Sequence, residues 1–159
     1  MILIAAVDSS WGIGYENDLL FHIPEDMKFF RSMTLNKTVV MGMATLDSLP
    51  GGNPLKNRDT VVLSTTMKER DDLTLCRSLD ELLKLLEGKE DVMVCGGESI
   101  YKLLLPYSDK AYITKIQRKK KADKFFPDLD KLPDWKLTEE SEEKEHEGIK
   151  FTFCTYERI

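Results

Sequence analysis

Residues 92–106 read VMVCGGESIYKLLLP and carry the clearest signal for the architecture. The apolar run Val92–Cys95 is typical of a buried strand, and Ser99–Leu105 has the spacing of a short helix that Pro106 ends. A strand that passes through a glycine pair directly into a helix is the repeating unit of parallel sheets. The pair Gly96-Gly97 leaves backbone N–H groups and the positive helix end open to an anion, although it could also serve only as a tight turn.

The same alternation of strand and helix continues on both sides of this stretch. It predicts strands at Ile2–Val7, Thr38–Met43, Thr60–Ser64, Leu73–Cys76 and Ala111–Ile116, and helices from Pro24, at Ala44–Leu49 and along Leu79–Leu86, where Gly88 stops the helix. Such units predict an α/β fold with an open, mostly parallel sheet and helices on both faces. Two final strands, near Lys136–Glu142 and Lys150–Glu157, should add an antiparallel edge. With no repeat or linker, we expect residues 1–159 to form one domain.

Composition and charge narrow the class of protein. Apolar residues make up 42% of the chain, as in a soluble globular protein, and the formal net charge of −5 argues against nucleic acid as the main partner. The basic run Arg118–Lys121 is short, so we interpret it as a solvated loop rather than a phosphate-binding patch. We interpret the acidic run Glu139–Glu145 as a strand end that leads into an exposed turn.

The cysteines and the first residues bear on the compartment. Cys76, Cys95 and Cys154 are an odd number without C-x-x-C spacing, which favours reduced thiols over a disulfide framework or a zinc site. Residues 1–7 lack the basic start of a signal sequence, and no apolar stretch has the length of a membrane span. We therefore expect a cytoplasmic protein that binds no metal and no membrane.

Asp26 is the residue that points most directly to chemistry. It lies two positions after Pro24, which suits the first turn of a helix. With Phe29, Phe30 and Met33 it follows the i, i+3, i+4, i+7 pattern, so it shares their apolar face. A carboxylate there loses hydration and needs a hydrogen-bonding partner or a raised pKa. The simpler alternative is an Asp that satisfies the helix N-terminus.

Three neighbouring features favour a binding site around Asp26. Met41-Gly42 repeats the arrangement of strand, glycine and helix, and two such strand ends suit a ligand with a pyrophosphate. The long apolar loop Asp8–Ile23 predicts a mobile lid over the cleft. Arg58 opens a strand after a Pro- and Gly-rich loop, where it is either solvated or placed to fork onto a carboxylate.

Six stretches, in this order, resemble the dihydrofolate reductase family across essentially the whole chain. They are GIGYEN at 12–17, IPEDMKFF at 23–30, VMGMAT at 40–45, VCGGESIY at 94–101, YIT at 112–114 and FPD at 126–128. The resemblance implies a central, mostly parallel eight-stranded sheet with an antiparallel C-terminal edge strand and about four flanking helices. It also implies reduction of 7,8-dihydrofolate to tetrahydrofolate, with hydride transfer from NADPH to pterin C6 and protonation of N5.

The resemblance assigns the substrate site residue by residue. Asp26 would be the single acidic group, which binds the 2-amino and N3 edge of the pterin, and Thr114 would bridge it through its hydroxyl. Phe21 stands where the family usually has an active-site Trp. Arg58 would hold the α-carboxylate of the glutamate tail, and Ile4 and Cys95 would offer backbone carbonyls. The implied substrate-binding residues are Ile4, Ala5, Asp26, Met27, Phe30, Leu49, Leu55, Arg58, Cys95, Tyr101 and Thr114.

The resemblance likewise assigns an NADPH site along the strand ends and the lid. Its members are Ala6, Ile13, Gly14, Asn17, Leu19, Gly42, Met43, Ala44, Thr45, Leu63, Ser64, Thr65, Arg77, Gly96, Gly97, Glu98, Ser99, Ile100 and Tyr101. The chain departs from the family pattern at several of these and neighbouring positions. Leu19-Leu20 lacks the usual Pro, and Met43 and Ser99 replace basic or polar residues near the 2′-phosphate. Arg77 and Thr65 match positions near that phosphate, so NADPH is expected over NADH.

Two other functions compete with this interpretation. One is a reductase on the same scaffold that acts on a pyrimidine or a deaminated flavin precursor, and the other is a non-catalytic nucleotide-binding module. Asp26 together with Arg58 favours a folate, because the two match the pterin edge and the glutamate tail. The expected partners are therefore dihydrofolate and antifolate inhibitors, with no nucleic acid, and the expected state is a monomer.

Overall fold

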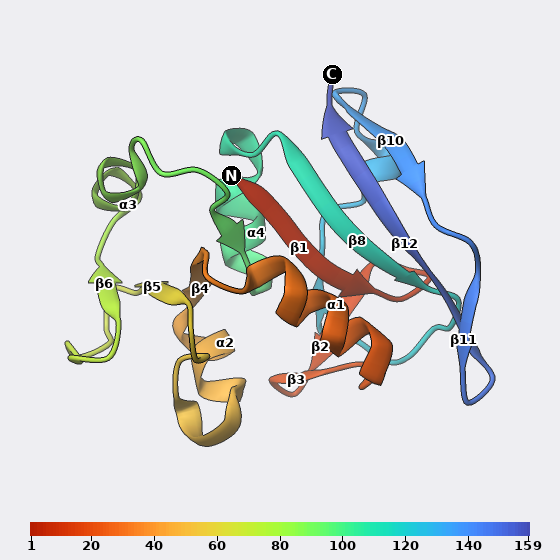
Figure 1. Cartoon of the computed structure of the whole chain (residues 1–159), viewed down its shortest axis with the longest axis horizontal. Helices are drawn as coiled ribbons and strands as arrows, with labels where there is room; N and C mark the ends of the chain where they lie inside the picture. The colour runs from red at the N-terminus through yellow and green to blue at the C-terminus, as the bar shows by residue number, and fades with distance from the viewer.

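A twisted sheet crosses the molecule in the order β10-β12-β8-β1-β7-β4-β5-β6, in a computed structural model that describes residues 1–159 (Figure 1). The neighbouring pairs are parallel from β8 through β1, β7, β4 and β5 to β6. Strand β12, in contrast, pairs antiparallel with β8, β10 and β11. The strands are β1 Ile2–Val7, β4 Thr38–Gly42, β5 Asp59–Leu63, β6 Thr74–Cys76, β7 Met93–Val94, β8 Lys110–Ile116, β10 Trp135–Glu140, β11 Lys144–His146 and β12 Ile149–Arg158. The predicted α/β class and the antiparallel C-terminal edge are confirmed.

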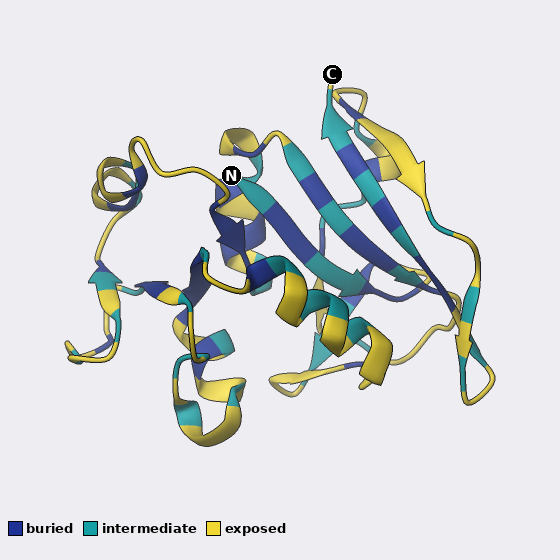
Figure 2. Ribbon diagram, in the orientation of Figure 1, coloured by how far each residue is buried: buried dark blue, intermediate teal, exposed yellow.

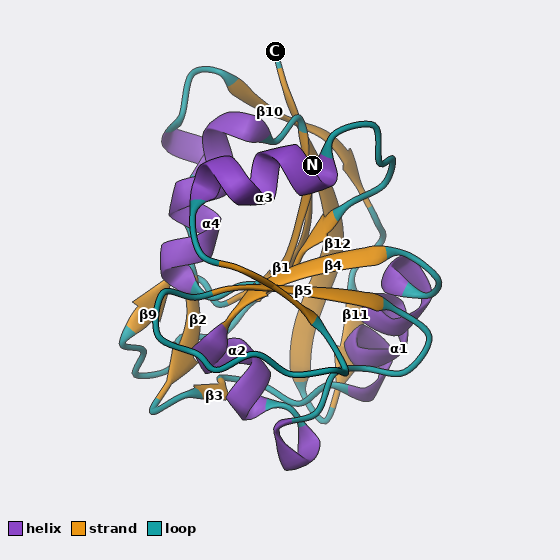
Figure 3. Ribbon diagram, turned by 90° about the vertical axis from the view of Figure 1, so that its left-hand side faces the viewer, coloured by secondary structure: helices purple, strands orange, loops and turns teal.

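Helices pack on both faces of this sheet, as the alternation of strands and helices predicts. Figure 3 shows α3 and α4 on one side of the strands and α1 on the other. The α-helices are α1 Pro24–Thr34, α2 Met43–Ser48, α3 Leu79–Leu86 and α4 Glu98–Leu104, and short 3₁₀ turns cover Pro50–Gly52, Leu105–Tyr107 and Leu129–Lys131. No helix is long and apolar enough to cross a membrane.

The two faces of the strands build two separate layers of core. Along β1, Leu3 packs with residues of α3 and α4, whereas its neighbour Ile4 packs with Leu46 of α2 and with the aromatic side of α1. This follows from the alternation of side chains along a strand. The central strands are consequently the most buried part of the molecule, as Figure 2 shows.

The segment between β1 and α1 differs from the expected loop. It contains a hairpin, β2 Gly12–Tyr15 and β3 Asp18–Leu19, and β2 also pairs with β9, Lys124–Phe125, to form a small second sheet. Glu16 and Asn17 form its two-residue turn with φ of 49° and 60°, the backbone that tight hairpins require. The prediction of a plain loop is wrong because two glycines and three charged or amide side chains hide the strand pattern of the hairpin, and because β9 lies far away in sequence.

Candidate functional site

The carboxyl ends of β4 and β7 meet beside the starts of α2 and α4. Ligands bind at this end of open parallel sheets. The backbone N–H of Gly42 donates to the carbonyl of Gly96 at 2.9 Å, and that of Cys95 donates to the carbonyl of Val40 at 2.8 Å. The two glycine turns that the sequence singles out are therefore direct neighbours in space.

The two turns of this glycine cradle can pack this closely against α4 only because they are glycines. A Cβ on Gly42 would lie 3.1 Å from Cγ1 of Ile100, and one on Gly96, whose φ is 117°, would lie 3.2 Å from the Tyr101 ring. Gly42 and Gly97 are the N-cap residues of α2 and α4, and neither helix start is closed by a side chain. Open N–H groups at two adjacent helix starts fit the pyrophosphate of a dinucleotide.

Asp26 lies on the first turn of α1, beside strand β8. The helix begins at Pro24, as predicted, and the carboxylate is half-buried. Its one hydrogen bond comes from Thr114, whose Oγ1 donates to Oδ1 at 2.6 Å, and it forms no ion pair. Desolvation raises the pKa of Asp26, and the Thr114 hydrogen bond opposes this without cancelling it. The simpler alternative, a carboxylate that satisfies the helix N-terminus, does not describe this contact.

The apolar positions of α1 face one core layer, as their spacing predicts. Phe29 stacks on Phe153 with ring centres 4.5 Å apart, on the side of β12. Phe29, Phe30 and Met33 all pack with the core layer that contains Ile4 and Met41. The expected substrate-pocket residues Phe30, Ile4, Leu49 and Cys95 belong to this one layer, whereas Met27 is 47% exposed and Leu55 is half-buried outside it.

Tyr101 ties the substrate side of the site to the cofactor side. Its hydroxyl donates to the carbonyl of Ile4 at 2.6 Å, and its ring packs on Phe126 with centres 4.7 Å apart. The Ile4 carbonyl, which the resemblance assigns to the pterin, thus already accepts one hydrogen bond, and its second lone pair remains for a ligand. Burial raises the pKa of Tyr101 far above its ordinary value, so the phenol stays protonated and remains a donor.

Arg58 is held in place rather than freely solvated. Its Nε donates to Thr34 Oγ1 at 3.1 Å, and its terminal nitrogens donate to the carbonyls of Lys56 at 2.6 Å and Arg31 at 3.0 Å. Partial burial and the charge of Arg31 lower the pKa of Arg58, yet a guanidinium remains protonated at neutral pH. No carboxylate of the chain pairs with it, and two of its five N–H groups remain for a ligand.

The residues expected around the 2′-phosphate lie at the ends of β4, β5 and β6. Arg77 Nη1 donates to the carbonyl of Ser64 at 3.2 Å, and Ser64 Oγ donates to Met43 Sδ at 3.8 Å. Thr65 is exposed beside them. The structure therefore brings one cation, Arg77, to this corner.

Glu98 is placed differently from the expected cofactor contact. Its carboxylate accepts the N–H of Phe125 in β9 at 2.6 Å and pairs with Lys102 at 3.6 Å. The side chain therefore holds the small sheet of β2, β3 and β9 against α4, and the Glu98 backbone belongs to the open helix start. Sequence reasoning could not find this contact, because Glu98 and Phe125 are 27 positions apart.

The sequence pattern does not single out two further residues that the structure shows to be fixed by hydrogen bonds, Asp8 and Lys120. Asp8 is buried at the start of the segment after β1, and its Oδ1 accepts the N–H groups of Ser10 and Gly12, each at 2.8 Å. Lys120 lies in the basic run that was expected to be solvated, yet its ammonium donates to the carbonyl of Leu20 at 2.8 Å. The run is exposed, as predicted, but the contact of Lys120 with a carbonyl 100 positions away leaves no signal in the local charge.

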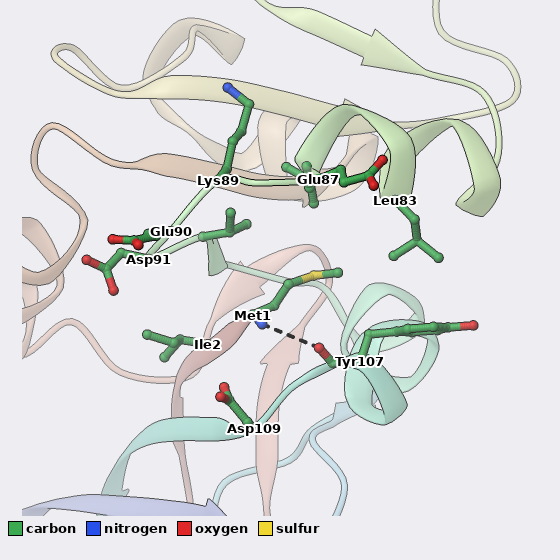
Figure 4. A pocket seen from close by; sticks show the side chains of 11 residues that line it. Met1, Ile2, Leu83, Glu87, Lys89, Glu90, Asp91, Tyr107 and Asp109 are labelled. Atoms are coloured by element: carbon green, nitrogen blue, oxygen red, sulfur yellow. Dashed lines mark hydrogen bonds between the residues drawn. The ribbon is translucent and has the colours of Figure 1, made fainter.

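A separate cavity lies at the opposite end of the sheet. It measures about 520 Å³ and opens where β1 and β7 begin, between α3 and the turn at Tyr107 (Figure 4). Apolar side chains such as Met1 and Leu86 line it together with the carboxylates of Glu90 and Asp109. None of the residues that line it belongs to the site around Asp26, so it takes no part in that site.

Comparison with known proteins identifies relatives over the full length of the chain. A family model described as dihydrofolate reductase matches residues 1–158. The dihydrofolate reductase of Bacillus subtilis (strain 168) is 34% identical over 158 residues, which cover 98% of this chain and 92% of that one. That of Staphylococcus haemolyticus is 32% identical over 160 residues, which cover 99% and 95%. A solved structure, dihydrofolate reductase from Enterococcus faecalis complexed with NADP(H) and RAB-propyl, superposes with a TM-score of 0.88 at 32% identity and covers 99% and 95% of the two chains.

Proposed function

Since the chain belongs to the dihydrofolate reductase family and catalyses the NADPH-dependent reduction of dihydrofolate, we propose which of its residues carry out that reaction. Asp26 is the acidic group that binds the 2-amino and N3 edge of the pterin. The observation that carries this proposal is the half-buried carboxylate with Thr114 as its single hydrogen-bonding partner and no cation beside it. A flat ligand edge with two N–H donors supplies what this carboxylate lacks.

The residues of the protein itself then bind the pterin and control its protonation. Thr114 donates to one carboxylate oxygen of Asp26 and so leaves the other free for the ligand. Once the ligand excludes water, the negative charge of Asp26 favours the form of the pterin that carries an additional proton at N5. NADPH supplies the hydride for C6 when it is bound. Phe21, just before α1, contributes an apolar wall in place of an indole N–H.

The glycine cradle supports the placement of NADPH. Its pyrophosphate would lie against the open helix starts after Gly42 and Gly97, with Thr45, Ser99 and Ile100 beside it. Arg77, Ser64 and Thr65 would hold the 2′-phosphate. The lid residues Ile13, Gly14, Asn17 and Leu19 would cover the nicotinamide.

Arg58 completes the substrate side. Its two remaining N–H groups would fork onto the α-carboxylate of the glutamate tail, and its three existing bonds fix the direction in which they point. We infer further that residues 1–159 act as one domain and as a cytoplasmic monomer. Because a relative from E. faecalis is solved with NADP(H) and RAB-propyl, we also infer that antifolate inhibitors occupy the same cleft here.

Substitution of Asp26 tests the central assignment. Asp26→Asn keeps size and much of the hydrogen bonding but removes the charge, so kcat/KM for dihydrofolate should fall about 10²-fold or more near neutral pH. Activity should recover in part at acid pH, where the substrate arrives protonated. The measurement is loss of absorbance at 340 nm with NADPH and dihydrofolate.

Two controls make the result specific. Asp71→Asn makes the same change at an exposed aspartate without side-chain partners and should behave as wild type. A pyrimidine or deaminated flavin precursor offered in place of dihydrofolate tests the rival reductase, and binding of NADPH without turnover would indicate a nucleotide-binding module. Full activity of Asp26→Asn at pH 7.5 would exclude the proposed role.

A further inference from the structure

The loop between β8 and β9 is fastened to the segment that follows β1. The backbone N–H of Lys120 donates to Oδ2 of Asp8 at 3.2 Å, while Oδ1 of Asp8 accepts from Ser10 and Gly12. Asp8 is only 3% exposed, so these bonds form away from bulk water. These bonds fix the position of the Lys120 backbone, and this limits the places that its side chain can reach.

The Lys120 side chain extends from this fixed point to the entrance of α1. Its Nζ donates to the carbonyl of Leu20 at 2.8 Å and lies 4.5 Å from the centre of the Phe21 ring. The first contact is a charge-assisted hydrogen bond, and the second has the geometry of a cation–π interaction. Leu20 and Phe21 connect the lid hairpin to the helix that bears Asp26.

We propose that Lys120 is a positioning residue for dihydrofolate reduction: it fixes Leu20 and Phe21 and so holds the lid in place over the reacting groups. This inference rests on the proposed lid role of residues 13–20. Lys120 acts through a backbone carbonyl and an aromatic ring, without requiring contact with either ligand. Its neighbour Lys121 makes a weaker contact of the same kind, 5.2 Å from the Tyr15 ring, on the hairpin itself.

The alternative is that the lysine merely covers an apolar ring and has no effect on the reaction. The two interpretations differ in the step that they affect. A covering role would change stability alone, whereas a positioning role changes the rate of the chemical step, because misplacement of the lid disturbs the geometry of the reacting groups.

The test compares two lysines that are adjacent in sequence. Lys120→Met removes the charge and keeps the aliphatic stem, and Lys119→Met makes the same change at an exposed side chain that forms no hydrogen bond, ion pair or cation–π contact. Lys120→Arg retains a charged donor. For each variant, single-turnover oxidation of NADPH at 340 nm gives the rate of the chemical step, and KM for dihydrofolate and Tm are measured alongside.

We expect Lys120→Met to slow the single-turnover step about 3- to 10-fold, which is a part of the free energy of one charged hydrogen bond and one cation–π contact, because the lysine acts on the reacting groups through the lid. Its KM for dihydrofolate should change less than about twofold, because the substrate contacts remain. Lys120→Arg should keep most of the wild-type rate, and Lys119→Met all of it.

Equal single-turnover rates in Lys120→Met and Lys119→Met would overturn the inference, as would a loss confined to Tm. Leu19→Ala, on the exposed lid hairpin, reports on the lid independently. A slower step in Leu19→Ala with an unchanged Lys120→Met overturns the role of Lys120 alone. No effect in either variant overturns the lid role together with it.

Discussion

Asp26 carries a charge that the folded chain by itself does not neutralise. Desolvation raises its pKa above the value in the unfolded chain, with Thr114 as the only hydrogen-bonding partner. Between the two pKa values the folded protein binds the proton more tightly than the unfolded chain does. The free energy of unfolding therefore falls as the pH rises from about 4 through the folded pKa, by linkage. A residue poised for a ligand lowers stability when the ligand is absent.

Removal of this charge should stabilise the protein while it inactivates the enzyme. We expect Asp26→Asn to raise Tm at pH 7 by about 2–4 °C, the shift that 1 kcal/mol produces in a chain of this size. The difference from wild type should vanish below about pH 4, where Asp26 is protonated in both states. Thermal unfolding at several pH values measures it, with Asp71→Asn as the exposed control. A Tm of Asp26→Asn below that of wild type at pH 7 would contradict a desolvated carboxylate.

At the scale of elements, local patterns predict the strands and helices whose apolar faces are continuous. Helix α3 Leu79–Leu86 and strand β1 Ile2–Val7 have the predicted bounds, and Gly88, with φ of 78°, follows the end of α3 as expected. The hairpin of β2 and β3 and the two-residue strand β9 were not predicted, because their pairing partners rather than their own side chains define them. Met43 was expected to end a strand and instead begins α2.

The glycine turn after β7 permits a sharp test of the cradle. Gly96 has φ of 117°, and an added Cβ would lie 3.2 Å from Tyr101. Gly96→Ala should therefore destabilise the protein by about 1–3 kcal/mol and raise KM for NADPH, since strain and the displaced ring both alter the cradle. Gly88→Ala is the matched control, because its φ of 78° imposes backbone strain but nothing lies within 4 Å of the new Cβ. An unchanged KM for NADPH in Gly96→Ala would show that this turn takes no part in binding the cofactor.

At the scale of the whole molecule, the site depends on contacts that join distant parts of the chain. Thr114 and Asp26 are 88 positions apart, and the N–H of Lys120 and the carboxylate of Asp8 are 112 apart. The residue types at Asp26 and Thr114 are visible in the sequence, and the family resemblance pairs them. The bond between Asp8 and Lys120, the bond of Lys120 to Leu20 and the Glu98 contact to β9 carry no local signal, because in each the partner lies far away in sequence.

Stability of the whole molecule also reports the choice of cofactor. A ligand that binds only the folded chain stabilises it by RT ln(1 + [L]/Kd). At equal, saturating concentrations, the stabilisation by two ligands therefore differs by RT times the logarithm of the ratio of their Kd values. Arg77 is the one cation near the expected 2′-phosphate, and one charge-assisted contact is worth about 1.5–3 kcal/mol. We expect NADPH to stabilise the protein by about that much more than NADH. Denaturant unfolding with each cofactor measures the difference.

Arg77→Ala should remove most of the difference between the two cofactors, while Lys84→Ala, which removes an exposed cation from α3, should leave it unchanged. Comparison within each variant cancels any loss of intrinsic stability, including the loss of the Arg77 bond to Ser64. Added salt should reduce the difference in wild type, because Arg77 is exposed and its charge is screened within about 10 Å at 0.1 M salt. If Arg77→Ala distinguishes NADPH from NADH as well as wild type does, backbone N–H groups and Thr65 hold the phosphate without it, and the cofactor preference comes from the helix starts rather than from a side-chain cation.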